Sequence, residues 1–447
     1  MMRLISKRSV LLALLDALAV TAAFGGGFFI RTGGFYGFQD IKFLNFYGFY
    51  LLILITLFYV FDLYYPFKYF KKAATIIDII FSVVIGMLIA AAASYAKRSF
   101  MLPRLIFVYT GLLLIPLIYL NRLFYDFLFA SHFFDQRVLV LGTGPLASQI
   151  VDVIKKTPHS GMELIGVVSE NRDISKKTIQ EIPVVGNVSD IVSLIDWYNI
   201  RLVVLALDPK QAVSEAGIMS QLFENRVTIT SSIHLFERLT GDVPYELFGS
   251  HYLLGLMSQI KTRPYLKLKR LMDIGTGVIL LGLLSPVLLF AMLILMFQGP
   301  QRIFFVQERI GRNGKTFQLI KLRSMRTGKS GKPVVTRLGK WIRKYRIDEI
   351  PQLINVIKGN MSLIGPRPEI PYFVNKCRKR IPFYDAVYAV NPGLTGWAQV
   401  SFRYTRTMKD YDQKFRYNLY YLKNMSLALD VLILIKTIRI ILLGKGQ

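Results

Sequence analysis

The chain has 447 residues, of which 53% are hydrophobic, and it carries a formal net charge of +28. It is too apolar for a nucleic-acid-binding protein, and its aromatic residues lie in long apolar runs rather than among the basic residues. We therefore assign the basic excess to an anionic membrane surface and to anionic substrates. The single cysteine, Cys377, excludes an internal disulfide, which fits a soluble part that faces the cytoplasm.

Four apolar segments near the N-terminus are long enough to cross a bilayer. They are Ser9–Ile30, Phe43–Tyr65, Ile76–Tyr95 and Leu102–Leu120. The first leads into more hydrophobic chain, so we expect an uncleaved anchor. For Asp16 and Asp78, which interrupt two segments, we prefer an interhelical hydrogen bond or a place near the interface over a buried functional charge. Basic residues are more frequent beside the segments on the N-terminal side, which predicts that both ends of this four-helix transmembrane unit, 1–130, face the cytoplasm.

A soluble α/β pattern begins near residue 135. The apolar strand Val138–Leu141 runs into Gly142-x-Gly144-x-x-Ala147 and a helical stretch, the strand, turn and helix order of a dinucleotide-binding fingerprint. A second strand, Leu164–Val168, ends near Glu170, where a ribose-binding acid can stand. These features predict a Rossmann-like, CoA- or nucleotide-binding-like domain over 135–260. Further strands are expected at Leu202–Leu207 and Val227–Thr230.

The sequence leaves open whether this middle domain binds a nucleotide. A domain of about 120 residues is short for a complete dinucleotide-binding domain. The glycines can also serve only the tight turn.

The apolar stretch Ile274–Phe297 is again long enough to span a bilayer. The chain that follows is rich in lysine and arginine, which resist translocation close to a membrane segment. Ser285-Pro286 lies near the middle, where proline removes a backbone hydrogen bond and bends a helix. We predict a re-entrant membrane hairpin over 269–297 that enters and leaves on one face, with a kinked full span as the alternative.

Three charged residues precede this stretch in the pattern Lys269-Arg270-x-x-Asp273. Lys269 and Arg270 would lie at the headgroup level and attract the phosphate of a lipid substrate. Asp273 would pair with one of them or fix the hairpin. Further on, alternation through Phe317–Arg323 predicts a strand pair around a glycine turn, with Lys321 and Arg323 on one face. As a charge pattern alone, such a face is more often solvated than part of a site.

Two adjacent carboxylates, Asp348 and Glu349, stand ahead of Pro351 and a short apolar helix that stops at Gly359. Spare N–H groups and the positive dipole end at a helix N-terminus hold a carboxylate ionised and bind anions. Asp348 alone can be a simple N-cap. The stretch Gly365-Pro366-Arg367-Pro368 follows, in which two prolines fix the backbone around a guanidinium suited to bidentate phosphate contact.

These residues closely resemble the bacterial sugar transferase family. The similar stretches are Asp348-Glu349-x-Pro351-Gln352-Leu353, Asn355, Lys358-Gly359, Met361–Pro368 and Asn391–Gln399, with the Lys-Arg-x-x-Asp and Ser-Pro pattern before them. The family comprises monotopic phosphoglycosyl transferases, which move a sugar-1-phosphate from a nucleotide diphosphate sugar onto undecaprenyl phosphate. The resemblance is strong from Lys269 onward and implies an α/β catalytic domain over 262–447.

The resemblance also implies a two-step reaction. Asp348 attacks the sugar-bearing phosphorus of a UDP-sugar, and an aspartyl phosphosugar forms before undecaprenyl phosphate collects it. Glu349, with Asp348, would bind Mg²⁺, and Arg367, Lys321 and Arg323 would bind phosphate. This reaction would be the first membrane step of exopolysaccharide, capsule or O-antigen (lipopolysaccharide) synthesis, with glucose or galactose as the expected hexose. The site would lie on the cytoplasmic face of the bacterial inner membrane, in contact with membrane lipid.

Other features allow further interpretations. In Asn391–Gln399 a sharp turn would bring backbone N–H groups close to a ligand, with Trp397 stacking on it and Gln399 contacting the substrate; a turn buried for packing is the alternative. The C-terminal stretch Met425–Leu443 fits an interfacial helix. Where the family commonly has an acid, this chain has Asn418.

Two other functional classes remain. Tyr265 and Lys269 have the Tyr-x-x-x-Lys spacing of a nucleotide-sugar dehydratase. A non-catalytic scaffold for polysaccharide assembly is the second. A homo-oligomer is compatible with each class, and the oligomeric state is left open.

Overall fold

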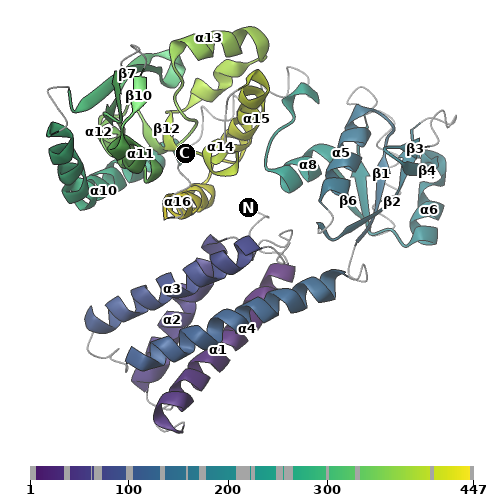
Figure 1. The fold of residues 1–447 in the computed structure, drawn as a ribbon. Coiled ribbons are helices and arrows are strands. Elements are labelled where there is room, and N and C mark those ends of the chain that lie inside the picture. Colours follow the sequence, from purple (N-terminus) through teal and green to yellow (C-terminus); the bar gives the residue numbers. More distant parts are fainter. Residues whose placement is uncertain are drawn as a thin grey trace. The chain divides into compact units, whose positions relative to one another are not determined.

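The computed structural model divides into two compact units, Met1–Thr240 and Gly241–Gln447 (Figure 1). It describes residues 7–34, 41–61, 63–64, 73–96, 104–130, 136–157, 160–170, 178–207, 222, 227–247, 255, 265–297, 302–327, 333–402 and 407–442.

Four apolar helices occupy the N-terminal part of the first unit. They are α1 (Lys7–Thr32), α2 (Ile41–Val60), α3 (Ala73–Ala96) and α4 (Arg104–Ala130). The predicted segments are confirmed, although α4 continues to Ala130 rather than ending at Leu120. By length and composition α1, α3 and α4 can cross a membrane, whereas the apolar part of α2, Leu44–Tyr59, is shorter. The protein is therefore a membrane protein.

A buried ion pair joins the first and last of these helices. Arg122 of α4 donates from Nη1 to Asp16 Oδ1 (2.9 Å) and from Nη2 to Asp16 Oδ2 (2.6 Å), and both side chains are 0% exposed. Asn121 donates to the carbonyl oxygen of Leu15 (3.0 Å). A charge in an apolar helix bundle is tolerated when an opposite charge satisfies it. The preferred interpretation of Asp16, an interhelical hydrogen bond, is confirmed.

The middle domain has a six-stranded sheet in the order β3-β4-β2-β1-β5-β6. Its strands are β1 (Gln136–Leu141), β2 (Met162–Ser169), β3 (Thr178–Ile179), β4 (Ile182–Asn187), β5 (Leu202–Leu205) and β6 (Thr228–Ser231). All neighbours are parallel except the antiparallel pair β3 and β4. The four predicted strands are confirmed, and the β3–β4 hairpin was missed.

Helices cover both faces of this sheet, because successive side chains of a strand point to opposite faces. Val138 and Val140 of β1 share a core with α5 (Pro145–Lys156) and α8 (Ser232–Thr240). Leu139 and Leu141 share another core with α6 (Ile191–Tyr198). Two apolar faces explain why β1 reads as a continuous hydrophobic run.

The segment Gly241–Leu247 belongs to the second unit, so the first unit ends at Thr240 rather than near residue 260. Val243 and Tyr245 lie in the core of the second unit. Trp397 donates a hydrogen bond to the carbonyl oxygen of Gly241 (2.7 Å), and the Tyr245 ring packs edge-on against Phe415 with centroids 5.0 Å apart.

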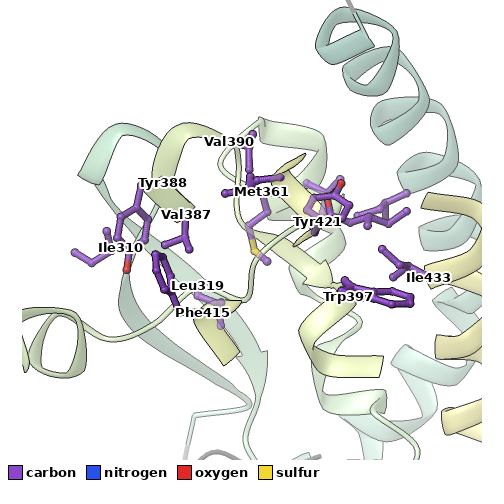
Figure 2. Packing of buried hydrophobic residues seen from close by; sticks show 14 of the residues in the cluster. Ile310, Leu319, Met361, Val387, Tyr388, Val390, Trp397, Phe415, Tyr421 and Ile433 are labelled. Atoms are coloured by element: carbon purple, nitrogen blue, oxygen red, sulfur yellow. The ribbon is translucent and has the colours of Figure 1, made fainter. Parts of the chain in front are cut away.

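The rest of the second unit surrounds one hydrophobic core, in which Leu319, Met361 and Phe415 lie (Figure 2). Its helices are α10 (Tyr265–Met296), α11 (Arg337–Lys344), α12 (Gln352–Lys358), α13 (Pro371–Arg380), α14 (Trp397–Ser401), α15 (Met408–Asn424) and α16 (Leu427–Leu442). Its strands form three pairs, β7 (Phe304–Ile310) with β8 (Thr316–Leu322), β9 (Met325–Thr327) with β10 (Pro333–Val335), and β11 (Ser362–Ile364) with β12 (Gly393–Thr395). The predicted strand pair around a glycine turn is β7–β8, which is antiparallel.

Helix α10 is one helix of 32 residues with Pro286 inside it, at the position where the sequence predicts a bend. It also begins at Tyr265, before the predicted start at residue 269. Ser285 donates its hydroxyl to the carbonyl oxygen of Gly282 (2.7 Å), which satisfies a backbone group beside the proline. Figure 1 shows the two arms of α10 at an angle to each other.

Both arms of α10 contact the same part of the second unit. In the first arm, Arg270 bonds to the end of α12. In the second, the carbonyl oxygen of Leu295 accepts a hydrogen bond from Arg323, directly after β8 (3.2 Å). Asn355 of α12 in turn bonds to β8, accepting from the Ile320 N–H (3.2 Å). A straight helix of this length would extend about 48 Å, so these contacts support a helix bent at Pro286 that returns to its own domain.

Candidate active site

The two acids lie in a 3₁₀ turn, Ile347–Glu349, between α11 and α12. Both are 8% exposed. Pro351 is the residue that caps α12, and Gly359 ends that helix in the left-handed conformation, with φ of 91°. Asp348 therefore caps no helix, and the N-cap alternative is wrong. The turn places both acids just ahead of the α12 N-terminus, close to the predicted location.

Two arginines hold Glu349. Arg367 donates from Nη2 to Glu349 Oε1 (3.0 Å), and Arg346 donates from Nη1 to both carboxylate oxygens (3.3 Å each). Burial alone would raise the pKa of Glu349, but Arg367, Arg346 and Lys321 outweigh it and lower the pKa to about 2. Glu349 is thus a fixed negative charge at any working pH.

Asp348 has the opposite environment. Burial and the neighbouring charge of Glu349 raise the pKa of Asp348 to about 6, although Lys321 and Arg343 oppose the shift. Within the described part of the chain, no lysine or arginine lies within ion-pair distance of its carboxylate. The site therefore pairs one anchored carboxylate with one that is more basic and has no cation bound to it, which suits a nucleophile.

Lys321 of β8 completes this cluster of charges. Burial and Arg367 lower the pKa of Lys321 to about 8, while Glu349 and Asp348 oppose the shift. The predicted location of Lys321 near the acids is confirmed, and its phosphate-binding role stays a prediction. A lysine with this pKa is mostly protonated at neutral pH and can neutralise phosphoryl oxygens.

Arg323 lies elsewhere. Its Nη2 atom donates to the Leu295 carbonyl oxygen near the end of α10 (3.2 Å), and no contact with the acid pair is seen in the described residues. Its predicted role in binding phosphate stays a prediction. Arg323 follows the end of β8, so the alternation of that strand does not fix where its guanidinium points.

Lys269 and Arg270 both bond to groups of the protein, and their predicted contact with a lipid phosphate stays a prediction. The Lys269 Nζ atom bonds to Asp430 of α16 (2.5 Å), and the two side chains are 10% and 7% exposed. Arg270 donates to the carbonyl oxygens of Val356 (2.6 Å) and Ile357 (2.7 Å). The last carbonyls of a helix lack partners within it, so a guanidinium there caps α12.

Asp273 fixes α10 to the strand that leads to Arg367. Its Oδ1 atom accepts a hydrogen bond from the Leu363 N–H of β11 (3.0 Å). Asp273 therefore has the predicted role of fixing this helix, and its partner is a backbone group rather than Lys269 or Arg270.

The glycine-rich stretch Asn391–Gln399 packs against the Gly365–Pro368 stretch that carries Arg367, rather than presenting free N–H groups. The Gly393 N–H donates to the carbonyl oxygen of Pro366 (2.8 Å). A Cβ atom at Gly393 would lie 2.1 Å from the Gly365 nitrogen, and one at Gly396 would lie 2.1 Å from the Gly365 oxygen. The glycines thus permit two backbone segments to touch, as the packing alternative predicts.

Trp397 is not free to stack on a ligand, because it is 6% exposed and its ring stacks on Tyr420 with centroids 5.6 Å apart. Gln399 donates to the carbonyl oxygen of Leu394 (3.2 Å), while its buried Oε1 atom has no hydrogen-bond partner among the described residues. Substrate contact by Gln399 stays a prediction.

Arg346 and Arg343 are functional-site residues that the sequence patterns did not single out. Both lie in the basic stretch just before the acids, where a charge run usually means a solvated surface. The signal that could have found Arg346 is its spacing three residues before Glu349, with which it pairs.

Comparison with known proteins agrees with this geometry. Residues 264–444 match the family described as "Bacterial sugar transferase" and residues 60–232 the family described as "CoA-binding domain". An uncharacterized sugar transferase of Bacillus subtilis is 36% identical over 190 residues, which are 40% of this chain and 89% of that protein. The chain belongs to the bacterial sugar transferase family.

Longer relatives carry more specific names. A UDP-N-acetylgalactosamine-undecaprenyl-phosphate N-acetylgalactosaminephosphotransferase of Aeromonas hydrophila is 42% identical over 219 residues, 47% of this chain. An undecaprenyl-phosphate glucose phosphotransferase of Komagataeibacter xylinus is 29% identical over 322 residues, 68% of this chain. The chain spans 51% of the Aeromonas protein and 58% of the Komagataeibacter protein.

The acid pair of this sugar transferase fits a magnesium ion of the phosphoryl-transfer type. Such an ion takes one or two carboxylates, and substrate phosphates and water supply its other ligands. Asp348 and Glu349 provide two carboxylates, and the described residues contain no group of three or more acid, histidine or cysteine ligands.

The glycine-rich turn of the middle domain does not fit a bound nucleotide phosphate. Glu170 accepts hydrogen bonds from the Thr143 N–H (2.7 Å) and the Thr143 hydroxyl (3.2 Å). Its carboxylate thus accepts from the central N–H of the turn between Gly142 and Gly144. A bound phosphate would need backbone N–H donors of this kind. Glu170 is engaged with this turn instead of standing free for a ribose.

Proposed function

We propose that this sugar transferase moves a sugar-1-phosphate from a UDP-sugar onto undecaprenyl phosphate through an aspartyl phosphosugar. The observation that carries the proposal is the asymmetry of the acid pair. Glu349 is held by two arginines, whereas Asp348 is buried, more basic and without an ion-pair partner among the residues that the structure describes. The names of the relatives support the same substrate classes.

In the first step, an Asp348 carboxylate oxygen forms a bond to the sugar-bearing phosphorus. The bond from that phosphorus to the bridging oxygen breaks, and UMP leaves with the electron pair. In the second step, a phosphate oxygen of undecaprenyl phosphate attacks the same phosphorus, and the Asp348 carboxylate leaves. The bonds formed and broken are equal in number in each step, and no oxidant or reductant is needed.

The charged neighbours divide the remaining work. Arg367 and Lys321 neutralise phosphoryl oxygens as charge develops. Glu349 keeps Arg367 and Arg346 in place. Asp348 and Glu349 would hold Mg²⁺, which would supply further charge neutralisation.

The sugar is glucose or N-acetylgalactosamine, the two that the names of the relatives give. Galactose, which the sequence resemblance also implied, stays a prediction. The lysine- and arginine-rich sequence after α10 favours a site on the cytoplasmic face of the inner membrane, where nucleotide sugars occur. The product would begin a cell-surface polysaccharide.

The test is exchange of radiolabelled UMP into UDP-sugars by the purified full-length protein with Mg²⁺ and no lipid acceptor. The panel contains UDP-glucose, UDP-N-acetylgalactosamine and UDP-galactose. Exchange that is lost in Asp348→Asn supports a covalent intermediate on this carboxylate. Asp385→Asn, at an exposed acid that pairs with Arg378 (2.8 Å), is the matched control and should exchange normally.

Other outcomes separate the alternatives. Lipid-dependent transfer without exchange would replace the two-step reaction by direct displacement. No transfer from any UDP-sugar would favour a scaffold. The dehydratase alternative loses support because Tyr265 and Lys269 both bond to Asp430.

A further inference from the structure

Glu369, which follows the Gly365-Pro366-Arg367-Pro368 stretch, lies in a charged cluster beside the reacting pair. Lys414 of α15 donates a hydrogen bond to Glu369 Oε1, and Arg309 Nη1 of β7 lies 3.9 Å from Glu369 Oε2. The three side chains are between 10% and 17% exposed, so water and salt screen these charges weakly. Nothing in the proposed reaction requires any of them to touch the substrate.

The same cluster holds the backbone on the C-terminal side of Arg367. Arg309 Nη1 donates to the carbonyl oxygen of Pro368 (3.2 Å), and the Ile310 N–H donates to that of Glu369 (3.0 Å). On the other side, the carbonyl oxygen of Pro366 accepts from Gly393 (2.8 Å). Arg367 is therefore fixed at both flanks, which limits where its guanidinium can reach.

Glu369 also offsets the repulsion between two nearby guanidinium groups. Burial lowers the pKa of Arg309, Glu369 raises it and Arg367 lowers it again. The pKa of Arg367 is raised mainly by Glu349 and further by Glu369. Without the Glu369 carboxylate, Arg309 and Arg367 would be like charges in a buried site, and Arg367 would be pushed away from Glu349.

We propose that Glu369, held by Arg309 and Lys414, is a positioning residue that keeps Arg367 on Glu349 for phosphoryl transfer. This inference rests on the proposed function. Because Glu369 acts through Arg367, replacing Glu369 should lower kcat little further once Arg367 itself has been replaced.

The test is a double-mutant cycle of Glu369→Gln and Arg367→Lys in the full-length protein, with transfer from the preferred UDP-sugar as the readout. Glu369→Gln should lower kcat by about 100-fold, as expected for a misplaced catalytic group. The KM for the UDP-sugar should change by no more than about twofold. In the Arg367→Lys background, Glu369→Gln should lower kcat by no more than about a further twofold, the usual error of additivity. Losses that multiply, or a loss confined to KM, would overturn the proposal.

Two further variants test the charge itself. Lys414→Met should reproduce part of the loss, and Lys414→Arg should restore kcat because it keeps a cation on Glu369. Equal activity of the two Lys414 variants would argue against positioning through charge. Asp385→Asn is the control for removing an acid.

A readout without substrate separates this inference from the proposed function. The Tm of each protein in the same double-mutant cycle is measured by thermal unfolding in detergent. Shifts in Tm that are non-additive would show that Glu369 and Arg367 are coupled even if no UDP-sugar were a substrate. Additive shifts would contradict the coupling even in an active transferase.

Discussion

Asp348 and Glu349 are neighbours in the chain but have opposite electrostatic surroundings. The guanidinium groups that stabilise Glu349 as an anion come from Arg346, on the same turn, and Arg367, which lies 18 residues further along. For Asp348, burial and the like charge of Glu349 outweigh the opposing charges of Lys321 and Arg343 and raise the pKa. A difference of this kind is how one site assigns two carboxylates to two roles.

This difference predicts the pH dependence of the first step. The pKa of Asp348 is raised to about 6, so its nucleophilic anion is lost as the pH falls through about 6, whereas Glu349 stays ionised. We expect the single-turnover rate of UMP release to fall about tenfold per pH unit below that value. A rate that stays constant down to about pH 5 would contradict the assignment of Asp348.

Removing the charge of Glu349 should have two effects. Glu349→Gln frees Arg346 and Arg367, so we expect the rate to fall by about 100-fold or more. It also removes a charge that raises the pKa of Asp348, so the residual activity should persist to lower pH than in the wild type. Arg346→Gln is the matched variant, since it leaves Arg367 on Glu349, and its loss should be smaller. Rate against pH for the three proteins checks both effects.

Sequence reasoning found the residues that share a short motif and failed where partners are distant in the chain. Asp348, Glu349 and Arg367 stand within one stretch, and their proximity follows from it. Lys269 meets Asp430 across 161 residues, and Arg270 meets Val356 across 86. No local pattern shows such partners, so both cations looked available for a lipid phosphate.

At the level of elements, α10 is bonded to the helix and the strand that position the acid pair and Arg367. Arg270 caps α12, which follows the acids, and Asp273 binds β11, which leads into Arg367. Lys269 ties the same helix to α16. The predicted break at Ser285-Pro286 is a bend within one helix, because proline removes a single N–H and leaves the other helical bonds available.

Removing the Arg270 cap from α12 should lower the free energy of unfolding by a measurable amount. Arg270→Gln should destabilise the second unit by about 2 kcal/mol, the usual loss for hydrogen bonds to a charged group. Lys267→Gln, at an exposed position of the same helix, is the control and should leave Tm unchanged. A variant with normal Tm but a raised KM for undecaprenyl phosphate would instead return Arg270 to a lipid-binding role.

The fingerprint of the middle domain has the predicted fold, but an acid of the chain bonds to its glycine turn. The sequence predicted the strand, the glycine turn and the helix, and the structure adds Glu170 on the central N–H of that turn. We expect purified protein to release no CoA or NAD on denaturation, measured by absorbance and mass spectrometry. Stoichiometric release of either would contradict this expectation.

At the scale of the whole molecule, the order of the three parts was predictable from hydropathy and motifs, but the boundary after the middle domain was not. The segment Gly241–Leu247 packs with residues more than 150 positions later, as in the bond from Trp397 to Gly241. It therefore extends the catalytic unit beyond the matched residues 264–444.

Val243 tests this extension, since it is 0% exposed. Val243→Asp should destabilise the catalytic unit by about 3 kcal/mol or more, because it buries an unpaired charge. Val334→Asp, at a valine that is 48% exposed, is the control. Thermal unfolding and transfer activity should both decline in the first variant alone. Equal effects of the two substitutions would mean that Gly241–Leu247 is only a linker.

The bend of α10 bears on the leaflet in which the lipid acceptor is collected and the lipid product is released. Under the proposed function, a helix whose two ends both return to the catalytic unit would let the transferase collect its polyprenyl acceptor and release its product in one leaflet. The sugar would stay on the side of the membrane where it was activated. A separate protein would then have to carry the loaded lipid across the bilayer before the sugar could join a polymer outside the cell.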